Sequence, residues 1–573
     1  MNSKSILAFL SFIGISIFSN AQTFPKNYFV APLDTPLVLL GTFGEIRKNH
    51  FHSGIDLSTN QQEGKPVYSA ADGFVSRIKI SNGGFGKAIY ISHPNGFVTV
   101  YGHLKKFNKT IQAYILKAQY EQKSYEVELK PAIAALIVKK NEVIAFSGNT
   151  GDSDGPHLHF EIRDRASEEP INPLHFGLKV NDIVPPVITN FRIFPVKGYG
   201  VLNHSDTPST YKIRKTQSGY ALIGSEPIQV FGSVGFGIEA TDSQPPSQAM
   251  LGIYSATLIV DQTIIYQFKM DRINFNDMRY VNAHIDYRSK LLDNNSIQRC
   301  FRLPGNHLNL YSTVANDGYY QFTDNNTHDL EMTVSDFNGN RSTLNLKILS
   351  NPGLKQKIVQ PGPMPNDWIS EQKGLEIEKP GIKIVIPPGA VYDTYPFEST
   401  TLKNAQATLC PVFRVGDRLV PVHTSITISI DPGQLPEALK QKAAIVSMNR
   451  PEKLEYEGGS WNGRFLTSKV KYFGDFTVLV DTIAPVVIKK YSEATLRNTS
   501  TLNLTISDEL SGILSYHATV DGKWLLMEYT KNGNQLTGDV STFAKNKKHH
   551  LHLVLTVTDR KNNKTVFEDY FFR

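Results

Sequence analysis

The chain has 573 residues, of which 40% are hydrophobic and 20% are charged. This composition is typical of folded globular protein, and the length is too great for one hydrophobic core, so we expect about three to five domains. The net charge of +7 is spread without a dense basic stripe, which argues against nucleic acid as a partner.

The first 21 residues are typical of a secretory signal peptide. Lys4 precedes an apolar run over 6–18 that is too short to span a bilayer, and small residues follow at Ser19 and Ala21. We therefore expect cleavage after Ala21 and an exported protein, periplasmic or extracellular and associated with the cell wall. No later stretch predicts a membrane span.

Residues 22–180 predict a compact antiparallel β-sheet domain. Short alternating strands are expected at 73–78, 87–91 and 97–101, and glycine-rich turns separate them. Pro94-Asn95-Gly96 predicts a hairpin turn between the last two strands.

A helix interrupts this β pattern. Ile111, Tyr114, Ile115 and Ala118 keep helical spacing, which predicts a helix over 109–123. We assign residues 108–140 to an insertion in the sheet domain and expect it to help shape a substrate groove.

Candidate metal ligands flank this insertion. His157 and His159 are two residues apart on an expected strand, so their imidazoles point to the same side. His52 and Asp56 would be roughly 13 Å apart on a straight strand, so Ser53-Gly54 must let the segment curl if both bind one ion. Three ligands, His52, Asp56 and His159, with one position left open, indicate a catalytic zinc site.

Two further histidines are candidates for proton transfer. His157 shares a strand face with His159 and is the expected general base. His103, at the end of an expected strand, suits a role in steadying an oxyanion. The alternative is that both support the ligands by hydrogen bonds. His50 forms a second His-x-His with His52, but we do not expect it to bind the metal.

These residues lie in motifs that resemble a known family. His52-x-x-x-Asp56, Tyr101-Gly102-His103-Leu104 and 155–161 (GPHLHFE) resemble the lysostaphin/LytM-type zinc endopeptidases, which hydrolyse peptidoglycan. The resemblance covers residues 40–175. It implies one zinc ion on His52, Asp56 and His159, with His103 and His157 as the catalytic histidines beside the water, and the stem peptides of peptidoglycan as the partner.

Two other functions remain open. One is a non-catalytic protein that binds the cell wall or activates hydrolases and retains a vestigial zinc site. The other is an endopeptidase for glycine-rich proteins. The presence of both His103 and His157 argues against the first, because a structural zinc site needs neither. Nothing in the sequence specifies an oligomeric state.

Downstream of the peptidase-like region the pattern is mainly β. We expect about three β-sandwich (Ig-like) modules, at 183–350, 355–480 and 482–573, the middle one being assigned only as β-rich. Two of them share short motifs, which are 182–187 (DIVPPV) with 481–486 (DTIAPV) and 333–336 (TVSD) with 556–559 (TVTD). The first and last modules are therefore predicted to be related.

Two remaining features concern the later modules. Ile386-Pro387-Pro388-Gly389-Ala390 in the middle module faintly resembles the β-sandwich modules of ankyrins and netrin receptors. Cys300 and Cys410 are the only cysteines, and we expect two buried thiols rather than a disulfide.

Overall fold

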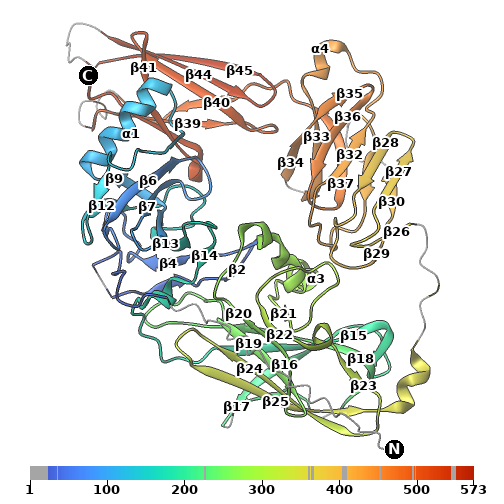
Figure 1. Ribbon diagram of the computed structural model, residues 1–573. Helices are drawn as coiled ribbons and strands as arrows, with labels where there is room; N and C mark the ends of the chain where they lie inside the picture. Colours follow the sequence, from blue (N-terminus) through green and yellow to red (C-terminus); the bar gives the residue numbers. More distant parts are fainter. Residues whose placement is uncertain are drawn as a thin grey trace, which may run out of the picture.

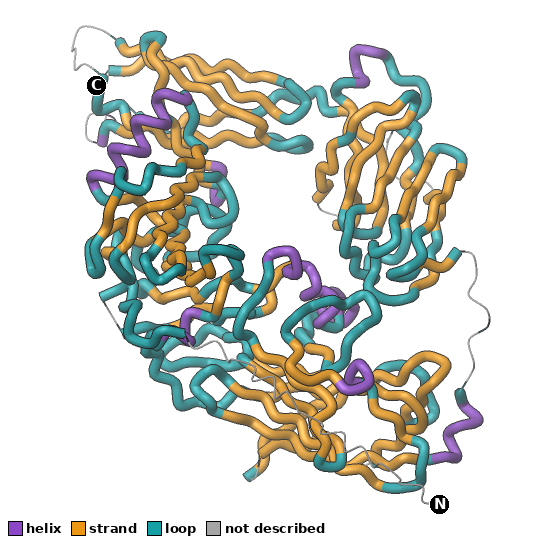
Figure 2. Tube along the Cα trace, in the orientation of Figure 1, coloured by secondary structure: helices purple, strands orange, loops and turns teal. Residues whose placement is uncertain are grey.

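The computed structural model describes residues 24–572 except 35, 218, 225–226, 359–361, 363–366, 403–408, 451–452, 493–495, 497–498 and 544–549. The predicted signal peptide lies outside the described residues. Strands dominate the described part of the chain, where helices are few and short (Figure 2). The chain forms four consecutive parts that follow one another around a ring (Figure 1). We call them the N-terminal domain (24–178) and the second (187–350), third (368–480) and fourth (486–571) modules.

The N-terminal domain contains two principal antiparallel sheets. The larger has, in order, β1 (Leu39–Gly41), β4 (Ile55–Ser58), β13 (His157–Asp164), β8 (Phe97–Gly102), β7 (Lys87–Ser92), β6 (Gly73–Ile80) and β10 (Val127–Leu129), with β11 (Ile137–Val138) beside β6 and β14 (Pro170–Ile171) beside β13. The smaller has β5 (Pro66–Tyr68), β12 (Val143–Ser147) and β9 (Leu104–Phe107). A separate hairpin joins β2 (Ile46–Arg47) to β3 (His50–Phe51). The neighbours β4, β13 and β8 carry or border the predicted site residues.

The predicted helix is present as α1 (Lys109–Gln122). Asn108 caps its first turn by accepting a 2.9 Å hydrogen bond from the backbone N–H of Ile111. Ile111 and Ile115 are buried against the sheet, as their spacing predicts. The helix ends at Lys123, which has the left-handed backbone conformation.

The strands of the second module join into one 11-stranded sheet instead of two separate sheets. They are β15 (Val187–Leu202), β16 (Ser209–Thr216), β17 (Gly219–Leu222), β18 (Ile228–Thr241), β19 (Ser255–Val260), β20 (Thr263–Lys269), β21 (Gln298–Arg299), β22 (Tyr311–Val314), β23 (Tyr320–Phe322), β24 (Thr327–Ser335) and β25 (Arg341–Ser350). Because β25 pairs with both β17 and β18, the sheet closes on itself. The helices are α2 (Val281–His284) and α3 (Tyr287–Asp293), preceded by a 3-10 helix, Phe275–Tyr280.

The N-terminal domain and the second module share one continuous hydrophobic core, which runs from Phe29 to Ile348. At their junction a Cβ added to Gly44 would lie 2.6 Å from Met270 Sδ, so glycine allows close approach there. The His175 ring contacts the Phe337 ring at 5.0 Å. The shared core therefore packs the second module directly against the N-terminal domain.

Each of the last two modules encloses its core between two antiparallel sheets. The third module has β27 (Leu375–Lys379), β28 (Ile382–Ile386), β32 (Ile426–Ile430), β36 (Phe465–Val470) and β35 (Ser460–Asn462) in one sheet, and β30 (Ser399–Leu402), β31 (Val412–Val415), β37 (Gly474–Val480), β33 (Ala443–Arg450) and β34 (Lys453–Gly458) in the other. It also has the pair β26 (Trp368–Ile369) and β29 (Tyr395–Pro396), and the helix α4 (Glu437–Lys440). The fourth module has β38 (Val486–Lys489), β39 (Thr501–Ser507), β43 (Gln535–Asp539) and β42 (Met527–Thr530) opposite β41 (Lys523–Leu525), β40 (Ile513–Val520), β44 (Leu551–Asp559) and β45 (Lys564–Phe571).

The fourth module returns to the N-terminal domain and closes the ring (Figure 1). The Trp524 ring meets the Tyr120 ring of α1 edge-on at 5.0 Å. Lys87 Nζ lies 2.5 Å from Glu528 Oε1, and Lys531 Nζ lies 2.9 Å from Asp152 Oδ1. The insertion that carries α1 thus serves as a contact surface for the fourth module.

Two further sequence expectations can be compared with the structure. Cys300 and Cys410 are both buried and are not joined in a disulfide, as predicted. None of the helices in the described part of the chain has the length and apolar character needed to cross a bilayer.

A buried histidine at the junction makes stability depend on pH. The His284 ring lies between Phe51 of the N-terminal domain and Phe268 of the second module, and burial lowers its pKa to about 4. The unfolded chain therefore binds the proton more readily than the folded chain between pH 4 and about 6.5. We expect the free energy of unfolding to fall, by at most about 3 kcal/mol from this group, as pH drops through that window.

Urea unfolding at pH 7.5 and 4.5 measures this effect. His284→Gln retains a polar side chain that does not titrate, and its stability should depend less on pH than that of the wild type. An equal pH dependence in both proteins would show that His284 does not contribute.

Candidate metal centre

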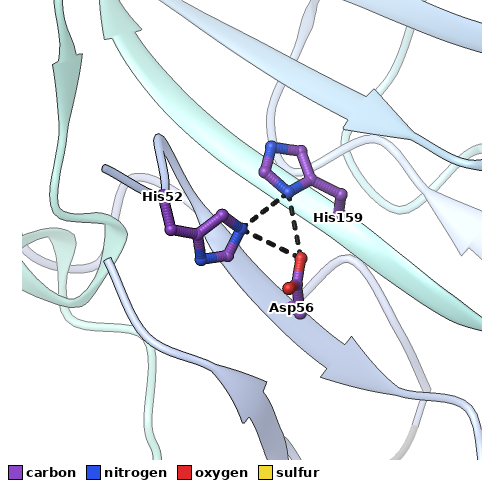
Figure 3. A group of neighbouring side chains, drawn as sticks. All are labelled: His52, Asp56 and His159. Carbon is purple, nitrogen blue, oxygen red and sulfur yellow. Dashed lines mark hydrogen bonds and ion pairs between the residues drawn. The ribbon is translucent and has the colours of Figure 1, made fainter. Parts of the chain in front are cut away.

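The three residues predicted as metal ligands come together with their donor atoms facing one another (Figure 3). His52 Nε2 lies 3.0 Å from His159 Nδ1 and 3.1 Å from Asp56 Oδ1, and His159 Nδ1 lies 3.0 Å from Asp56 Oδ1. Donors about 2.1 Å from one tetrahedral zinc ion would be roughly 3.4 Å apart. The triangle is slightly contracted relative to that spacing, and its two nitrogens and one oxygen fit zinc.

The backbone curls between His52 and Asp56. Strand β3 ends before His52 and β4 begins after Gly54, so the intervening turn brings the two side chains together. A Cβ on Gly54 would lie 2.5 Å from the carbonyl oxygen of Phe160 on β13, so this position has no room for a larger residue. Asp56 pairs in register with His159 across β4 and β13, which brings the third ligand into place.

Hydrogen bonds select the tautomers of the two ligand histidines. His52 Nδ1 lies 2.8 Å from the carbonyl oxygen of Thr42, which can only accept, so Nδ1 carries the hydrogen. His159 Nε2 lies 3.0 Å from Glu161 Oε1 and donates to it in the same way. In its neutral form each imidazole therefore directs a lone pair into the triangle.

Asp56 is held as a carboxylate. Burial alone raises the pKa of Asp56, but the charge of His52 and the neighbouring imidazoles of His157, His159 and His52 hold it well below its usual range. Arg47 Nη2 donates a 2.9 Å hydrogen bond to Asp56 Oδ2, which leaves Oδ1 for the triangle. An ionised oxygen ligand is thus available at neutral pH.

Glu161 organises the layer of residues behind His159. It is fully buried, accepts from the hydroxyl of Ser53 through Oε1, and accepts from Arg163 Nε at 2.5 Å through Oε2. Burial raises the pKa of Glu161, but Arg163 and His159 lower it to about 2. Burial lowers the pKa of His159, yet its bonds to Asp56 and Glu161 raise it to about 9, so a metal must displace a proton there at neutral pH.

We expect Glu161→Gln to weaken zinc binding by about 10–100-fold. The amide oxygen can still accept from His159, but the negative charge that makes this imidazole a stronger ligand is lost. Competition with a chromophoric chelator measures the affinity. Glu168→Gln, an exposed change near the end of the same strand, is the matched control and should bind zinc as the wild type does. Equal affinities in all three proteins would contradict the role assigned to Glu161.

The two remaining predicted residues lie beside the triangle. The rings of His103 and His157 are 4.7 Å apart, and His157 Nε2 lies 3.4 Å from Asp56 Oδ1. Each has its Nδ1 bound to a carbonyl oxygen, of Thr150 at 2.7 Å for His103 and of Gly155 at 2.8 Å for His157. In this arrangement Nε2 of both rings is left as an acceptor.

The environment of His103 favours a role different from the one expected from sequence. Burial, together with the charges of His159 and His157, lowers the pKa of His103 to about 3. A neutral ring with its hydrogen on Nδ1 can accept a hydrogen bond at Nε2 but cannot donate one to an oxyanion. The geometry of His103 is therefore that of a hydrogen-bond acceptor at Nε2.

A cavity of about 1390 Å³ opens over the triangle, and the five predicted residues are among those that line it. The second module supplies further lining residues, which are Pro246, Ser247, Gln248, Ala249, Phe275 and Met278. Among the described residues, none of the 108–140 insertion lines this cavity, contrary to our expectation that the insertion would shape the groove. The insertion instead packs against the fourth module.

Several residues of the site were not singled out from sequence. Glu161 could have been found, because it lies two residues beyond His159 and shares the strand face of both histidines. Arg47 and the carbonyl of Thr42 lack a comparable sequence signal. The same holds for the cavity wall over 246–249, which comes from a module far away in sequence.

Comparison with known proteins identifies two regions of the chain. Residues 50–120 and 128–173 match the model of peptidase family M23, and residues 366–481 match the model of a Zu5-like domain. The first match contains all five predicted site residues. The chain therefore contains a peptidase family M23 domain, and the resemblance drawn from its motifs is confirmed.

Individual relatives match part of the chain. DD-carboxypeptidase/endopeptidase Mpg of Neisseria meningitidis serogroup B is 35% identical over 132 residues, which are 23% of this chain and 24% of that protein. Peptidoglycan DD-endopeptidase ShyA of Vibrio cholerae is 26% identical over 188 residues, 32% of this chain and 37% of that protein. The solved catalytic domain of lysostaphin from Staphylococcus simulans is 25% identical, with 24% of this chain and 87% of that one covered and a TM-score of 0.18. The matched region spans about a quarter of the Neisseria relative.

Proposed function

We propose that this protein is an exported, zinc-dependent endopeptidase that hydrolyses peptide cross-links of peptidoglycan. The observation that carries the proposal is the triangle of His52 Nε2, Asp56 Oδ1 and His159 Nδ1, with acceptor nitrogens of His103 and His157 beside it. A purely structural zinc site has no need of the two additional imidazoles. Export rests on the signal peptide predicted over residues 1–21.

The side chains of this site have different roles in the proposed reaction. A zinc ion held by His52, Asp56 and His159 would supply a Lewis acid able to activate water at neutral pH. His157 Nε2 accepts the proton of the attacking water and passes it to the departing amine, which completes hydrolysis of a peptide bond. His103 Nε2 accepts a hydrogen bond and holds the water in line.

The two histidines differ in the charges that surround them. His157 Nε2 lies 3.4 Å from Asp56 Oδ1, so a carboxylate stands beside this ring. Burial and two neighbouring imidazoles disfavour the charged form of His103. This contrast supports His157 as the general base.

The substrate class is inferred from the relatives and from the shape of the site. The names of the Neisseria and Vibrio relatives give endopeptidase activity, in the second case on peptidoglycan. The cavity over the triangle is large enough to admit a branched peptide, because it exceeds the size of ordinary small-molecule sites. Peptidoglycan stem peptides fit both the activity named for these relatives and the size of the cavity.

Incubating purified, zinc-loaded protein with sacculi tests the proposal. We expect soluble muropeptide fragments, loss of release on treatment with a zinc chelator, and recovery when zinc is returned. Release of fragments from a glycine-rich protein but not from sacculi would favour the alternative substrate. Intact sacculi with stoichiometric zinc would instead favour a binding or activating protein.

A further inference from the structure

We propose that Asp182, Asp242 and Asp336 bind a calcium ion at the junction of the N-terminal domain and the second module. One carboxylate oxygen from each residue lies within 4.8 Å of the others. Two oxygens that are each about 2.4 Å from one calcium ion can be at most about 4.8 Å apart, so the three can share an ion. Carboxylate oxygens are hard donors, which favour calcium over transition metals.

A buried oxygen without a partner points to a ligand at this place. Asp242 is only 5% exposed, and its Oδ1 accepts no hydrogen bond from the described residues. Such an atom ordinarily has a partner in a folded protein. Asp242 lines a small cavity together with Asp182 and Asp336, so a ligand there would contact all three.

The cavity has the size of a single ion and lies between two parts of the chain. Its volume is about 20 Å³, which holds one ion or one water molecule. The N-terminal domain contributes five of its lining residues, which are Leu39, Thr42, Phe43, Asn172 and Leu174. A bound ion would therefore fasten the second module to the domain that carries the metal centre.

The carboxylates around Asp242 concentrate negative charge, which a bound cation would balance. Burial raises the pKa of Asp242 to about 7, and the charges of Asp182 and Asp336 add to this rise. The interactions that favour its ionised form come from the Ser243 backbone amide and from no cationic side chain among the described residues. Buried carboxylates at this spacing are costly unless a counter-charge accompanies them.

An equivalent cluster is formed by Asp508 and Asp559 of the fourth module and by Asp481, which lies just before it. In both clusters an asparagine side chain donates hydrogen bonds to two of the aspartates. Asn340 Nδ2 donates to Asp336 Oδ2 at 2.6 Å and to the Asp182 carbonyl at 3.1 Å. In the fourth module, Asn563 Nδ2 donates at 2.7 Å and 2.9 Å to the corresponding atoms of Asp559 and Asp481.

The fourth-module cluster differs in its charge. Lys561 stands two residues after Asp559, where the second module has Asn338 two residues after Asp336. Burial lowers the pKa of Lys561, while the charges of Asp481 and Asp559 raise it, so the ammonium group lies near enough to compensate these carboxylates. We therefore place calcium in the junction cluster alone, and the fourth-module cluster provides an internal control.

The junction site is connected to the wall of the active-site cavity. Asp242 and Leu251 exchange two backbone hydrogen bonds of 2.8 Å, which close the loop between them. Within this loop the Gln244 side chain accepts from the Leu39 N–H at 2.7 Å. The tip of the loop, 246–249, lines the cavity over the metal centre. Calcium at Asp242 would hold this wall in place.

Calcium titration of the full, zinc-loaded chain tests the site. Isothermal calorimetry with CaCl2 should find one calcium site, and calcium should raise the Tm. Asp242→Asn removes one ligand charge while keeping the size of the side chain, and it should weaken binding about tenfold or more and abolish the rise in Tm. Asp508→Asn in the fourth module should leave both the site count and the Tm shift unchanged.

Stability measured without calcium distinguishes a ligand role of Asp242 from a purely structural one. Without calcium, Asp242→Asn should be at least as stable as the wild type, because it relieves repulsion among three carboxylates. Absence of any calcium-dependent rise in the wild-type Tm would overturn the proposal. An Asp242→Asn protein that retains the full calcium-dependent rise would overturn it as well. A response to MgCl2 equal to that to CaCl2 would contradict the choice of calcium.

Discussion

His157→Ala is expected to lower hydrolysis of peptidoglycan by about 10²–10⁴-fold while the protein retains its zinc. The loss follows from removing the acceptor at Nε2, whereas the donor triangle of His52, Asp56 and His159 stays complete. His157 is also more exposed than the three ligands, so truncating it costs little packing. Metal content by mass spectrometry and release of muropeptides measure the two properties independently.

The conservative variant His157→Gln distinguishes a chemical role from a spatial one. It retains a polar group of similar reach but cannot take up a proton, so it should be nearly as inactive as the alanine variant. Activity close to the wild-type level in either variant would show that another group acts as the base.

His159→Ala is expected to lose both zinc and activity. It removes one corner of the triangle and leaves the buried Glu161 carboxylate without the imidazole that it binds. Loss of metal assistance is worth several kcal/mol, which is about 10³-fold or more in rate. Zinc content after dialysis and the rate on sacculi are the measurements.

A control for this variant lies close by in sequence. His50→Ala changes the other histidine of the His50-x-His52 pair, whose Nδ1 lies 2.9 Å from the carbonyl oxygen of Lys48 at an exposed position. Its zinc content should match that of the wild type. Zinc loss in His50→Ala with retention in His159→Ala would reverse the ligand assignment.

The residues of the site could be predicted because their chemistry is local. His157 and His159 share a face through the two-residue period of a strand, and the curl between His52 and Asp56 follows from Ser53-Gly54. The helix over 109–123 was predicted to within one residue of its observed end, because its apolar spacing is regular.

What the sequence could not predict depends on contacts between distant segments. The cavity wall over 246–249 lies almost two hundred residues from His52 in sequence. The spacing of apolar residues along the chain does not predict packing between segments so far apart. The packing of Trp524 on Tyr120 is of the same kind, and it explains why the insertion forms a contact between modules instead of a groove. The acceptor role proposed for His103 depends on the position of the Thr150 carbonyl, which fixes the tautomer.

The central claim is that a metal held by His52, Asp56 and His159 directs water onto a peptide cross-link. A defined cross-linked muropeptide dimer, digested by the zinc-loaded protein in H2¹⁸O, tests it most directly by mass spectrometry. We predict conversion to monomers, one ¹⁸O atom incorporated in the new carboxyl group per bond cut, and no conversion by His159→Ala. A dimer that stays intact in the presence of stoichiometric zinc, or that His159→Ala cleaves as fast as the wild type, would contradict the claim.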